Sequence, residues 1–394
     1  MATNNNNKAL NVPPLRFPEF NGEWEKCTIK DYGEVVTGNT PPTSNSEYYD
    51  NGSYLWASPA DLGISKNITE TKTKLSLSGF RKTRNIPKGS VLITCIGSTI
   101  GKMGMATETM SSNQQINSIV INDKSDSDFV YYAISRAFPR YLSEVGIQAV
   151  PILSKSNFEK LPNYTTCREE QDKIGYFLNL LDERIATQNK IIEDLKKLKS
   201  AIIEMEYTHK TKSNSHIGDF IEQTSKRNKN CAIQNVLSVS NRQGFIQQSE
   251  QFENRSVASD DTSNYKIVEK NDFAFNPARI NVGSIARLTT FDRGIVSPMY
   301  ICFRTKDTLF PEYLDYYFET KQFFTEIQKR LEGSVRQCLS FEGLCNIPLC
   351  IPTIEVQRQV GNQLSTLAQE IKLEIDFLEL LQRQKKFLLH QMFI

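Results

Sequence analysis

The sequence predicts an α+β fold: two mixed α/β domains, each followed by a long helix, in an internal two-fold repeat. The first observation is that Leu339 to Phe393 repeats Leu153 to Tyr207 at a constant offset (339 − 153 = 186) without a gap. The second is that both copies carry helical apolar periodicity, and the third is that strand-like runs and turns precede them. Identical pairs include Leu153/Leu339, Ser154/Ser340, Pro162/Pro348, Glu169/Glu355, Gln171/Gln357, Gly175/Gly361, Leu178/Leu364, Leu195/Leu381 and Lys199/Lys385.

The expected boundaries follow from these patterns. The chain begins with an asparagine tract that lacks the basic and apolar regions of a secretory signal, and Thr208 to Ser215 is polar and poor in helix formers. We therefore expect a disordered tail over 1–14, a first domain over 15–165, a spacer helix over 166–207, a linker over 208–216, a second domain over 217–351 and a second spacer helix over 352–394.

The two domains are expected to mix strands with shorter helices. Runs such as Ser90 to Ile96 favour strands, whereas Phe129 to Phe138 and Tyr313 to Arg330 favour helices. Gly101 corresponds to Gly283 at an offset of 182 (283 − 101), whereas the offset in the helices is 186 (339 − 153). The difference indicates small insertions or deletions within the domains.

In both long helices, apolar residues recur at steps of three and four and define a coiled-coil seam. In the first helix the seam runs through Ile174, Leu178, Leu181 and Ile185, and the second copy keeps the same phase. Gln188 and its equivalent Glu374 interrupt both seams. A polar residue at a core position can fix helix register, and the alternative is a gap that faces the surface.

Composition restricts the function classes. The 394 residues include 47 Lys and Arg against 45 Asp and Glu, so a nucleic-acid surface has to be local. The eight cysteines form no Cys-x-x-Cys pair and there are three histidines, which indicates reduced thiols in a cytosolic protein and no zinc site. Apolar runs are too short for a membrane span. We expect a soluble, cytoplasmic protein.

No motif indicates catalysis. A methyltransferase acting on a flipped adenine needs an Asp/Asn-Pro-Pro-aromatic loop, and Asn276-Pro277-Ala278-Arg279 does not match it. Gly97 to Met103 has too short a gap for a phosphate-binding loop and lacks its final hydroxyl. No carboxylate spacing nominates an acid/base pair or a metal site. The sequence predicts no catalytic, cofactor-binding or metal-ligating residue.

Several segments resemble the specificity subunit of type I restriction-modification enzymes. They are Leu15 to Phe20 with Trp24, then Thr37-Gly38-Asn39-Thr40-Pro41, then Gly283 to Arg287 and Arg293 to Pro298. The order of these segments, within two copies of a domain and a helix, carries the resemblance over the whole chain.

The resemblance implies two target-recognition domains that each read half of an interrupted double-stranded DNA site. Two antiparallel helices would act as the ruler between them. It also implies two adenine methyltransferase subunits, which use S-adenosylmethionine, and optionally two motor-nuclease subunits, which use ATP and Mg; these cofactors bind the partners and not this chain. Because the two domains match poorly outside their frame, an asymmetric site is expected.

Candidate DNA contacts are basic residues for phosphates, and Arg, Asn or Gln for base edges. A charge run has the alternative of a solvated face, and Arg279 and Arg287 have the alternative of pairing with an internal carboxylate. The first domain offers Lys72, Lys74, Arg81, Lys82, Arg84, Asn113, Gln114 and Gln115, and the second offers Lys226, Arg227, Lys229, Asn241, Arg242, Asn276, Arg279, Arg287 and Arg293.

Two other functions stay open from the residues alone. One is a self-contained DNA-binding regulator whose helices pair with another copy. The other is a helical adaptor whose domains bind proteins. Co-purification with a methyltransferase separates the first from a specificity subunit. Salt-sensitive, sequence-selective DNA binding opposes the second.

Overall fold

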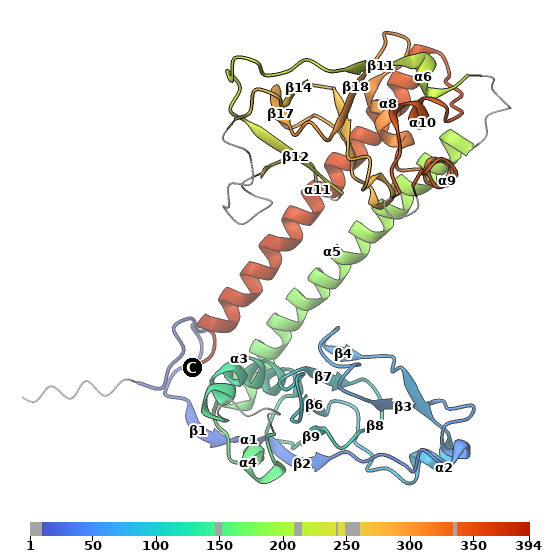
Figure 1. The fold of residues 1–394 in the computed structure, drawn as a ribbon. Coiled ribbons are helices and arrows are strands. Elements are labelled where there is room, and N and C mark those ends of the chain that lie inside the picture. The colour runs from blue at the N-terminus through green and yellow to red at the C-terminus, as the bar shows by residue number, and fades with distance from the viewer. Residues whose placement is uncertain (1–9, 146–151, 209–214, 242, 249–260, 334–336) are drawn as a thin grey trace, which may run out of the picture. The chain divides into compact units, whose positions relative to one another are not determined.

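The computed structural model describes residues 10–145, 152–208, 215–241, 243–248, 261–333 and 337–394 (Figure 1). The chain forms two compact units. Unit 1 comprises Met1–Asn189 and Asp376–Ile394, and unit 2 comprises Lys190–Ile375. The two long helices, α5 (Arg168–Thr208) and α11 (Ile354–Gln391), each contribute one part to each unit. The predicted fold class, mixed domains joined by two long antiparallel helices, is confirmed.

Unit 1 is built on a five-stranded sheet with the order β2-β9-β6-β7-β4. A second sheet has the order β5-β3-β8, and β1 pairs with β10. The strands are β1 (Glu25–Thr28), β2 (Gly33–Thr37), β3 (Tyr54–Ala57), β4 (Asn67–Ile68), β5 (Thr73–Leu75), β6 (Val91–Thr94), β7 (Met103–Ala106), β8 (Ser111–Ser112), β9 (Ile116–Ile121) and β10 (Pro162–Thr165). The helices before α5 are α1 (Ile29–Tyr32), η1 (Ser46–Tyr48), α2 (Leu77–Phe80), α3 (Ser127–Val145) and α4 (Lys155–Glu159).

Alternation along β6 explains why this sheet is covered on both faces. Val91 and Ile93 belong to a core that also contains residues of α3, α5 and α11. Leu92, which points to the opposite face, packs in a second core with residues of β3. Every residue of β6 is buried, as expected for a central strand with cores on both sides.

Unit 2 repeats this plan. Its main sheet has the order β11-β18-β15-β16, which matches β2-β9-β6-β7 strand for strand, and its second sheet has the order β13-β12-β17-β14. The strands are β11 (Ile221–Thr224), β12 (Val236–Ser240), β13 (Gly244–Gln247), β14 (Lys266–Glu269), β15 (Phe273–Phe275), β16 (Ile285–Arg287), β17 (Arg293–Val296) and β18 (Ile301–Thr305). The helices before α11 are α6 (Ile217–Phe220), η2 (Ile280–Val282), α8 (Pro311–Tyr317), α9 (Lys321–Gln328) and α10 (Phe341–Cys345).

The repeated glutamines join each long helix to its unit. Gln171 Oε1 accepts from the Asp126 amide at 3.0 Å, and its Nε2 donates to the Thr166 carbonyl at 2.8 Å. Gln357 makes the same pair of contacts, with the Phe310 amide at 2.8 Å and the Pro352 carbonyl at 2.9 Å. Both side chains are buried, so each satisfies backbone groups that would otherwise be stranded.

The repeated glycines allow close helix approach. A Cβ on Gly175 would lie 2.4 Å from Asp126 Oδ1, and one on Gly361 would lie 2.9 Å from Glu312 Cβ. Larger residues would separate each helix from its unit, which explains why both copies keep glycine despite its cost inside a helix.

The repeated lysines mark where each helix enters the other unit. Lys199 of α5 lies 5.0 Å from the Tyr316 ring centroid, inside unit 2. Its equivalent in α11, Lys385, lies 5.7 Å from the Tyr132 centroid and pairs with Asp182 of α5, inside unit 1. At each end, therefore, a repeated lysine lies over the ring of a repeated tyrosine.

Some sequence expectations need correction. Residues 1–9 of the expected tail lie outside the described residues, but residues 10–14 are ordered by contacts such as the Trp24 amide with the Asn11 carbonyl at 2.7 Å. Most of the expected linker, 209–214, also lies outside them. Gln188 is buried, so the surface-facing alternative is wrong there. No described helix is long and apolar enough to cross a membrane.

Candidate nucleic-acid interface

Strand pairing gathers three connections at one end of the main sheet of unit 1. β2 ends where Thr37 faces Asn117, and β6 ends where Thr94 faces Ile116. The connections that leave β2, link β6 to β7 and lead into β9 therefore lie together. We call residues 38–41, 95–102 and 113–115 the unit 1 loop end.

Asn39 fixes a basic segment against this loop end. Its Nδ2 donates to the Lys82 carbonyl at 2.9 Å, and its Oδ1 accepts from the Arg84 amide at 2.8 Å. Arg84 Nη1 in turn donates to the Thr37 carbonyl at 2.8 Å. Asn39, which the sequence analysis did not single out, thus holds the backbone of Lys82 and Arg84, whose side chains are exposed, at the loop end.

The predicted amide residues have different roles. Gln114 is exposed, and its Oε1 accepts from Thr40 Oγ1 at 2.5 Å. Asn113 is buried, with its Nδ2 donating to Gln115 Oε1 at 3.1 Å and its Oδ1 accepting from the Gln115 amide at 3.0 Å. Both ends of its amide thus bond within the loop, which argues against Asn113 as a base-reading residue, whereas Gln114 stays a prediction.

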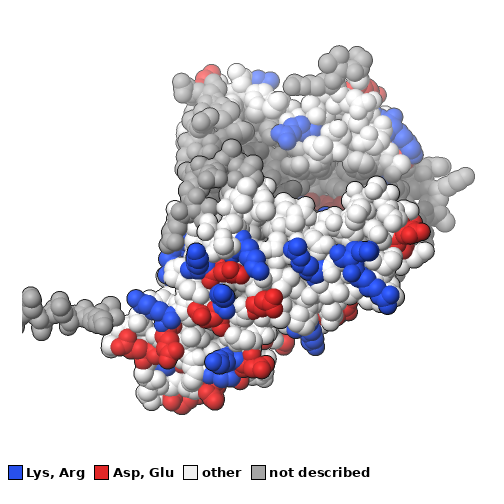
Figure 2. Space-filling model, turned by 90° about the horizontal axis from the view of Figure 1, so that it is seen from below, with Lys and Arg blue, Asp and Glu red and all other residues white. Residues whose placement is uncertain are grey.

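The remaining unit 1 candidates lie on or near the second sheet. Lys74 pairs with Glu70 at 2.8 Å on the edge strand β5, while Lys72 is exposed just before that strand. Arg81 is exposed after α2. Figure 2 shows basic and acidic side chains interspersed on the face seen from below, so no unbroken positive field covers it.

Unit 2 has an equivalent loop end. β11 ends where Thr224 faces Cys302, and β15 ends where Phe275 faces Ile301. Residues 225–229, 276–284 and 297–300 therefore lie together and form the unit 2 loop end. Gly101 and Gly283 occupy matching turns, each with φ of about +90°, a conformation that favours glycine.

The unit 2 loop end collects four predicted basic residues. Lys226, Arg227 and Lys229 follow β11 and are exposed, and Arg227 Nη1 donates to Asn264 Oδ1 at 2.7 Å. Arg279 is exposed in the β15–β16 connection, and its carbonyl accepts from the Ser284 amide at 3.1 Å. Among the described residues its guanidinium has no ion-pair partner.

Two candidates of unit 2, Arg293 and Arg287, are not brought to this place. Arg293 is the first residue of β17 and pairs with Glu269 at one end of β14, whereas Arg227 of the loop end forms a β-bridge with Lys266 at the other end. Arg293 therefore lies away from the unit 2 loop end. Arg242 lies outside the described residues. The Arg287 side chain is 8% exposed and pairs with Glu312 at 2.6 Å and with an aspartate of α8 at 3.1 Å, which argues against a contact with DNA.

Sequence reasoning missed Asn39 and Thr40 as site residues, although both stand in a segment that carried the resemblance. Turn residues after a strand, followed by a proline, were the available signal. What they bond to depends on residues more than 40 positions away. Within the described part of the chain, no three His, Cys, Asp or Glu side chains gather where they could hold a metal ion.

Comparison with known families agrees with this geometry. Residues 21–197 match the profile of the type I restriction modification DNA specificity domain. This part of the chain is thus similar to a DNA specificity domain. The matched span begins just before β1 and extends into α5.

Curated relatives match parts of the chain. The type I restriction enzyme HindI specificity subunit of Haemophilus influenzae is 31% identical over 151 residues, covering 37% of this chain and 32% of that protein. The MjaIX specificity subunit of Methanocaldococcus jannaschii is 32% identical over 188 residues, covering 45% and 42%. The matches thus span less than half the length of these relatives.

Solved structures share the fold along nearly the whole chain. The crystal structure of a type I restriction-modification S subunit from M. genitalium has a TM-score of 0.63 at 16% identity, covering 97% of this chain and 99% of that one. A chain from work on complex assembly of the type I R-M system has a TM-score of 0.55 at 13% identity, covering 95% and 98%. At such identities the likeness establishes the fold.

Proposed function

We propose that this chain is the DNA sequence-recognition subunit of a type I restriction-modification complex and that each unit reads one half of an interrupted double-stranded site. The observation that carries the proposal is the pair of loop ends, which have the same strand order but different side chains. Unit 1 offers Lys82, Arg84 and Gln114, whereas unit 2 offers Lys226 and Arg279, with other basic neighbours. Different side chains read different base edges, so the site is asymmetric.

In this proposal the chain is a scaffold and carries out no catalysis. Two methyltransferase subunits with S-adenosylmethionine modify adenine N6, and two motor-nuclease subunits with ATP and Mg are optional additions. Helices α5 and α11, which contribute to both units, support a scaffolding role because they give the partners one continuous frame. The complex acts in the cytoplasm.

The first test is to express the chain with its neighbouring methyltransferase and motor genes and to map methylated adenines by single-molecule sequencing. We expect one interrupted motif that disappears when this chain is deleted. Methylation that is indifferent to deletion, with a competent methyltransferase present, contradicts the proposal and favours a regulator or an adaptor.

The second test separates the half-sites. Arg279→Ala should weaken binding at one half-site by about 1–3 kcal/mol, roughly 5- to 150-fold, if Arg279 contacts a base. Gln114→Ala should affect the other half-site only. Arg293→Ala is the matched control, because Arg293 is an exposed arginine of the same unit that lies away from the loop end. Equal effects of all three on both half-sites contradict the assignment.

A further inference from the structure

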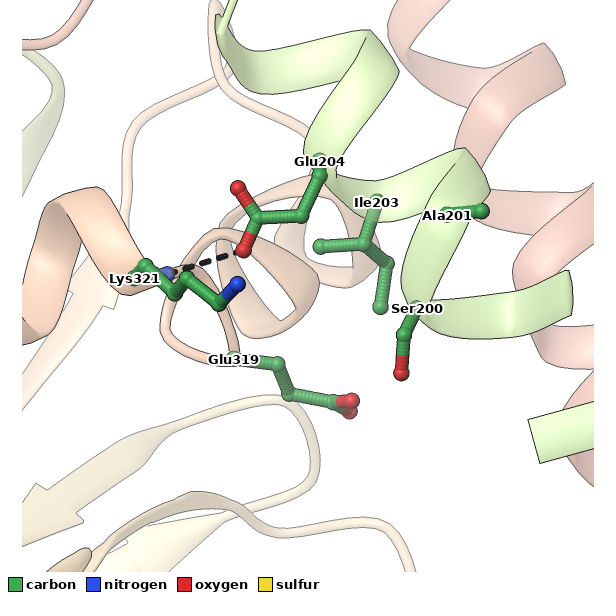
Figure 3. A pocket seen from close by; sticks show the side chains of 6 residues that line it. All are labelled: Ser200, Ala201, Ile203, Glu204, Glu319 and Lys321. Carbon is green, nitrogen blue, oxygen red and sulfur yellow. Dashed lines mark hydrogen bonds between the residues drawn. The ribbon is translucent and has the colours of Figure 1, made fainter. Parts of the chain in front are cut away.

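The duplication creates two hollows at equivalent positions. In unit 1, α3 and the end of α11 enclose a groove of about 720 Å³. In unit 2, the end of α5 and the start of α9 enclose a groove of about 350 Å³ (Figure 3). The offset of 186 relates Lys386 to Ser200, Phe387 to Ala201 and His390 to Glu204. We call these hollows the unit 1 groove and the unit 2 groove.

The unit 2 groove is electrostatically satisfied. Its acidic residues, Glu204 and Glu319, both have basic or amide partners. Glu204 Oε1 accepts from the Lys321 amide at 3.2 Å, as Figure 3 shows, and Glu319 pairs with Lys199 at 2.7 Å. Ala201 stands where unit 1 has a phenylalanine, so this groove offers little apolar surface.

The unit 1 groove has the opposite character. Arg136, Arg383 and Lys386 line it, together with Phe387, which is 60% exposed. Arg383 reaches Glu379 only at 3.6 Å, and both side chains are mostly in solvent, where such a pair contributes little. Lys386 has no ion-pair partner among the described residues.

Arg136 reinforces this excess of positive charge. Its Nη2 donates to His390 Nδ1 at 2.7 Å, and an imidazole nitrogen supplies no negative charge. Its Nε is buried and has no partner within the described structure. A buried donor without an acceptor is costly, and no carboxylate of the described residues pairs with this guanidinium.

The composition of the groove selects the class of ligand. An exposed phenylalanine beside unneutralised cations fits a segment that carries both an apolar side chain and carboxylates. DNA fits less well, because its interfaces are strongly polar and charged. In addition, neither α3 nor α11 contributes a residue to the unit 1 loop end.

We propose that the unit 1 groove binds an acidic, partly apolar segment of a protein partner, and that the unit 2 groove lacks the charges to bind the same segment. The inference rests on the proposed function, in which a methyltransferase subunit docks on this chain. It adds that the partner contacts at the two units are chemically unequal despite the repeated frame, and that the contact at unit 1 weakens with salt.

The test uses the full chain and the co-expressed methyltransferase, with affinity measured by biolayer interferometry and stoichiometry by light scattering. The groove variant is Arg383→Glu with Lys386→Glu, and a second variant is Phe387→Ala. All three side chains are largely exposed, so folding should be retained, as circular dichroism will check. The matched control is Lys26→Glu with Lys30→Glu, an equal charge change at exposed positions of unit 1.

We expect the groove variant and Phe387→Ala each to lower methyltransferase affinity at least about 10-fold, or to remove one copy, while the control binds as the parent does. Parental affinity should also fall as salt rises. Equal binding by parent, variants and control overturns the groove assignment but leaves the proposed function intact. A parent that never binds the methyltransferase overturns both. Loss of DNA binding by the isolated groove variant shows a nucleic-acid surface and overturns the protein assignment.

Discussion

Replacing Arg287 by methionine should destabilise unit 2 rather than alter base reading. The change keeps most of the side-chain length and removes the charge that meets Glu312 and Asp315 at 2.6 and 3.1 Å. Breaking a buried ion pair by removing one partner typically costs about 3–5 kcal/mol. The two carboxylates are 21% and 32% exposed, so we expect about 3 kcal/mol, the lower end of that range.

The stability lost in the Arg287→Met variant should depend on pH. Burial raises the pKa of Asp315 to about 6, although Arg287 pulls it down. Below the unfolded pKa of about 3.9 this group's contribution to stability is fully present, and it is lost as pH rises through the folded pKa. Without Arg287 the pKa of Asp315 rises further. The methionine variant should therefore lose more stability at pH 7.5 than at pH 5.

Urea unfolding at the two pH values measures the loss, and hydrogen exchange of β16 and α8 shows whether it is local to unit 2. The matched control is Arg293→Met, an exposed arginine whose replacement should change stability by less than about 0.5 kcal/mol. The reasoning is refuted if Arg287→Met is as stable as the parent at pH 7.5. It is refuted equally if the variant stays folded and loses recognition of one half-site.

Three further predictions concern the repeated frame and the thiols. Gly175→Ala, which normally favours a helix, should lower the stability of unit 1 by about 1–3 kcal/mol in thermal unfolding, because the new Cβ would lie 2.4 Å from an aspartate oxygen; a gain in stability would contradict this. Gln357→Ala should cost about 1–3 kcal/mol by stranding a buried amide, whereas exposed Gln359→Ala should be near neutral. At pH 8 a thiol reagent should modify exposed Cys167 quickly and Cys95 only on unfolding, since burial raises the pKa of Cys95 to about 12; comparable rates would show that Cys95 is accessible.

The two long helices and their repeated contacts were predictable because the duplication repeats the same local sequence in both copies. Gln357 repeats Gln171, and both side chains accept a hydrogen bond from a backbone amide of their unit. Gly361 repeats Gly175, and both allow the helix to approach its unit closely. Apolar periodicity likewise predicted both long helices within a few residues. These features depend on short sequence distances, where spacing maps directly onto one face of a helix.

The candidate site was predictable only in part. Lys82 and Gln114 belong to segments that the sequence marked as polar, but Asn39 acquires its role by contacting residues 43 and 45 positions away. Arg287 looked like other exposed arginines beside a glycine turn. Its strand places it against α8, where two carboxylates neutralise it.

The sequence by itself determined the duplication, the two long helices and the mixed character of the domains, because residue periodicity and repeat spacing encode them. Only the tertiary structure decided which polar side chains stay available to a ligand. It brought strand ends together to form the two loop ends, buried Asn113 and Arg287, and left Arg383 and Lys386 in a groove whose counterpart in unit 2 is neutralised. Whether a charge is free depends on what packs across from it, and that partner is set by chain topology rather than by neighbouring residues.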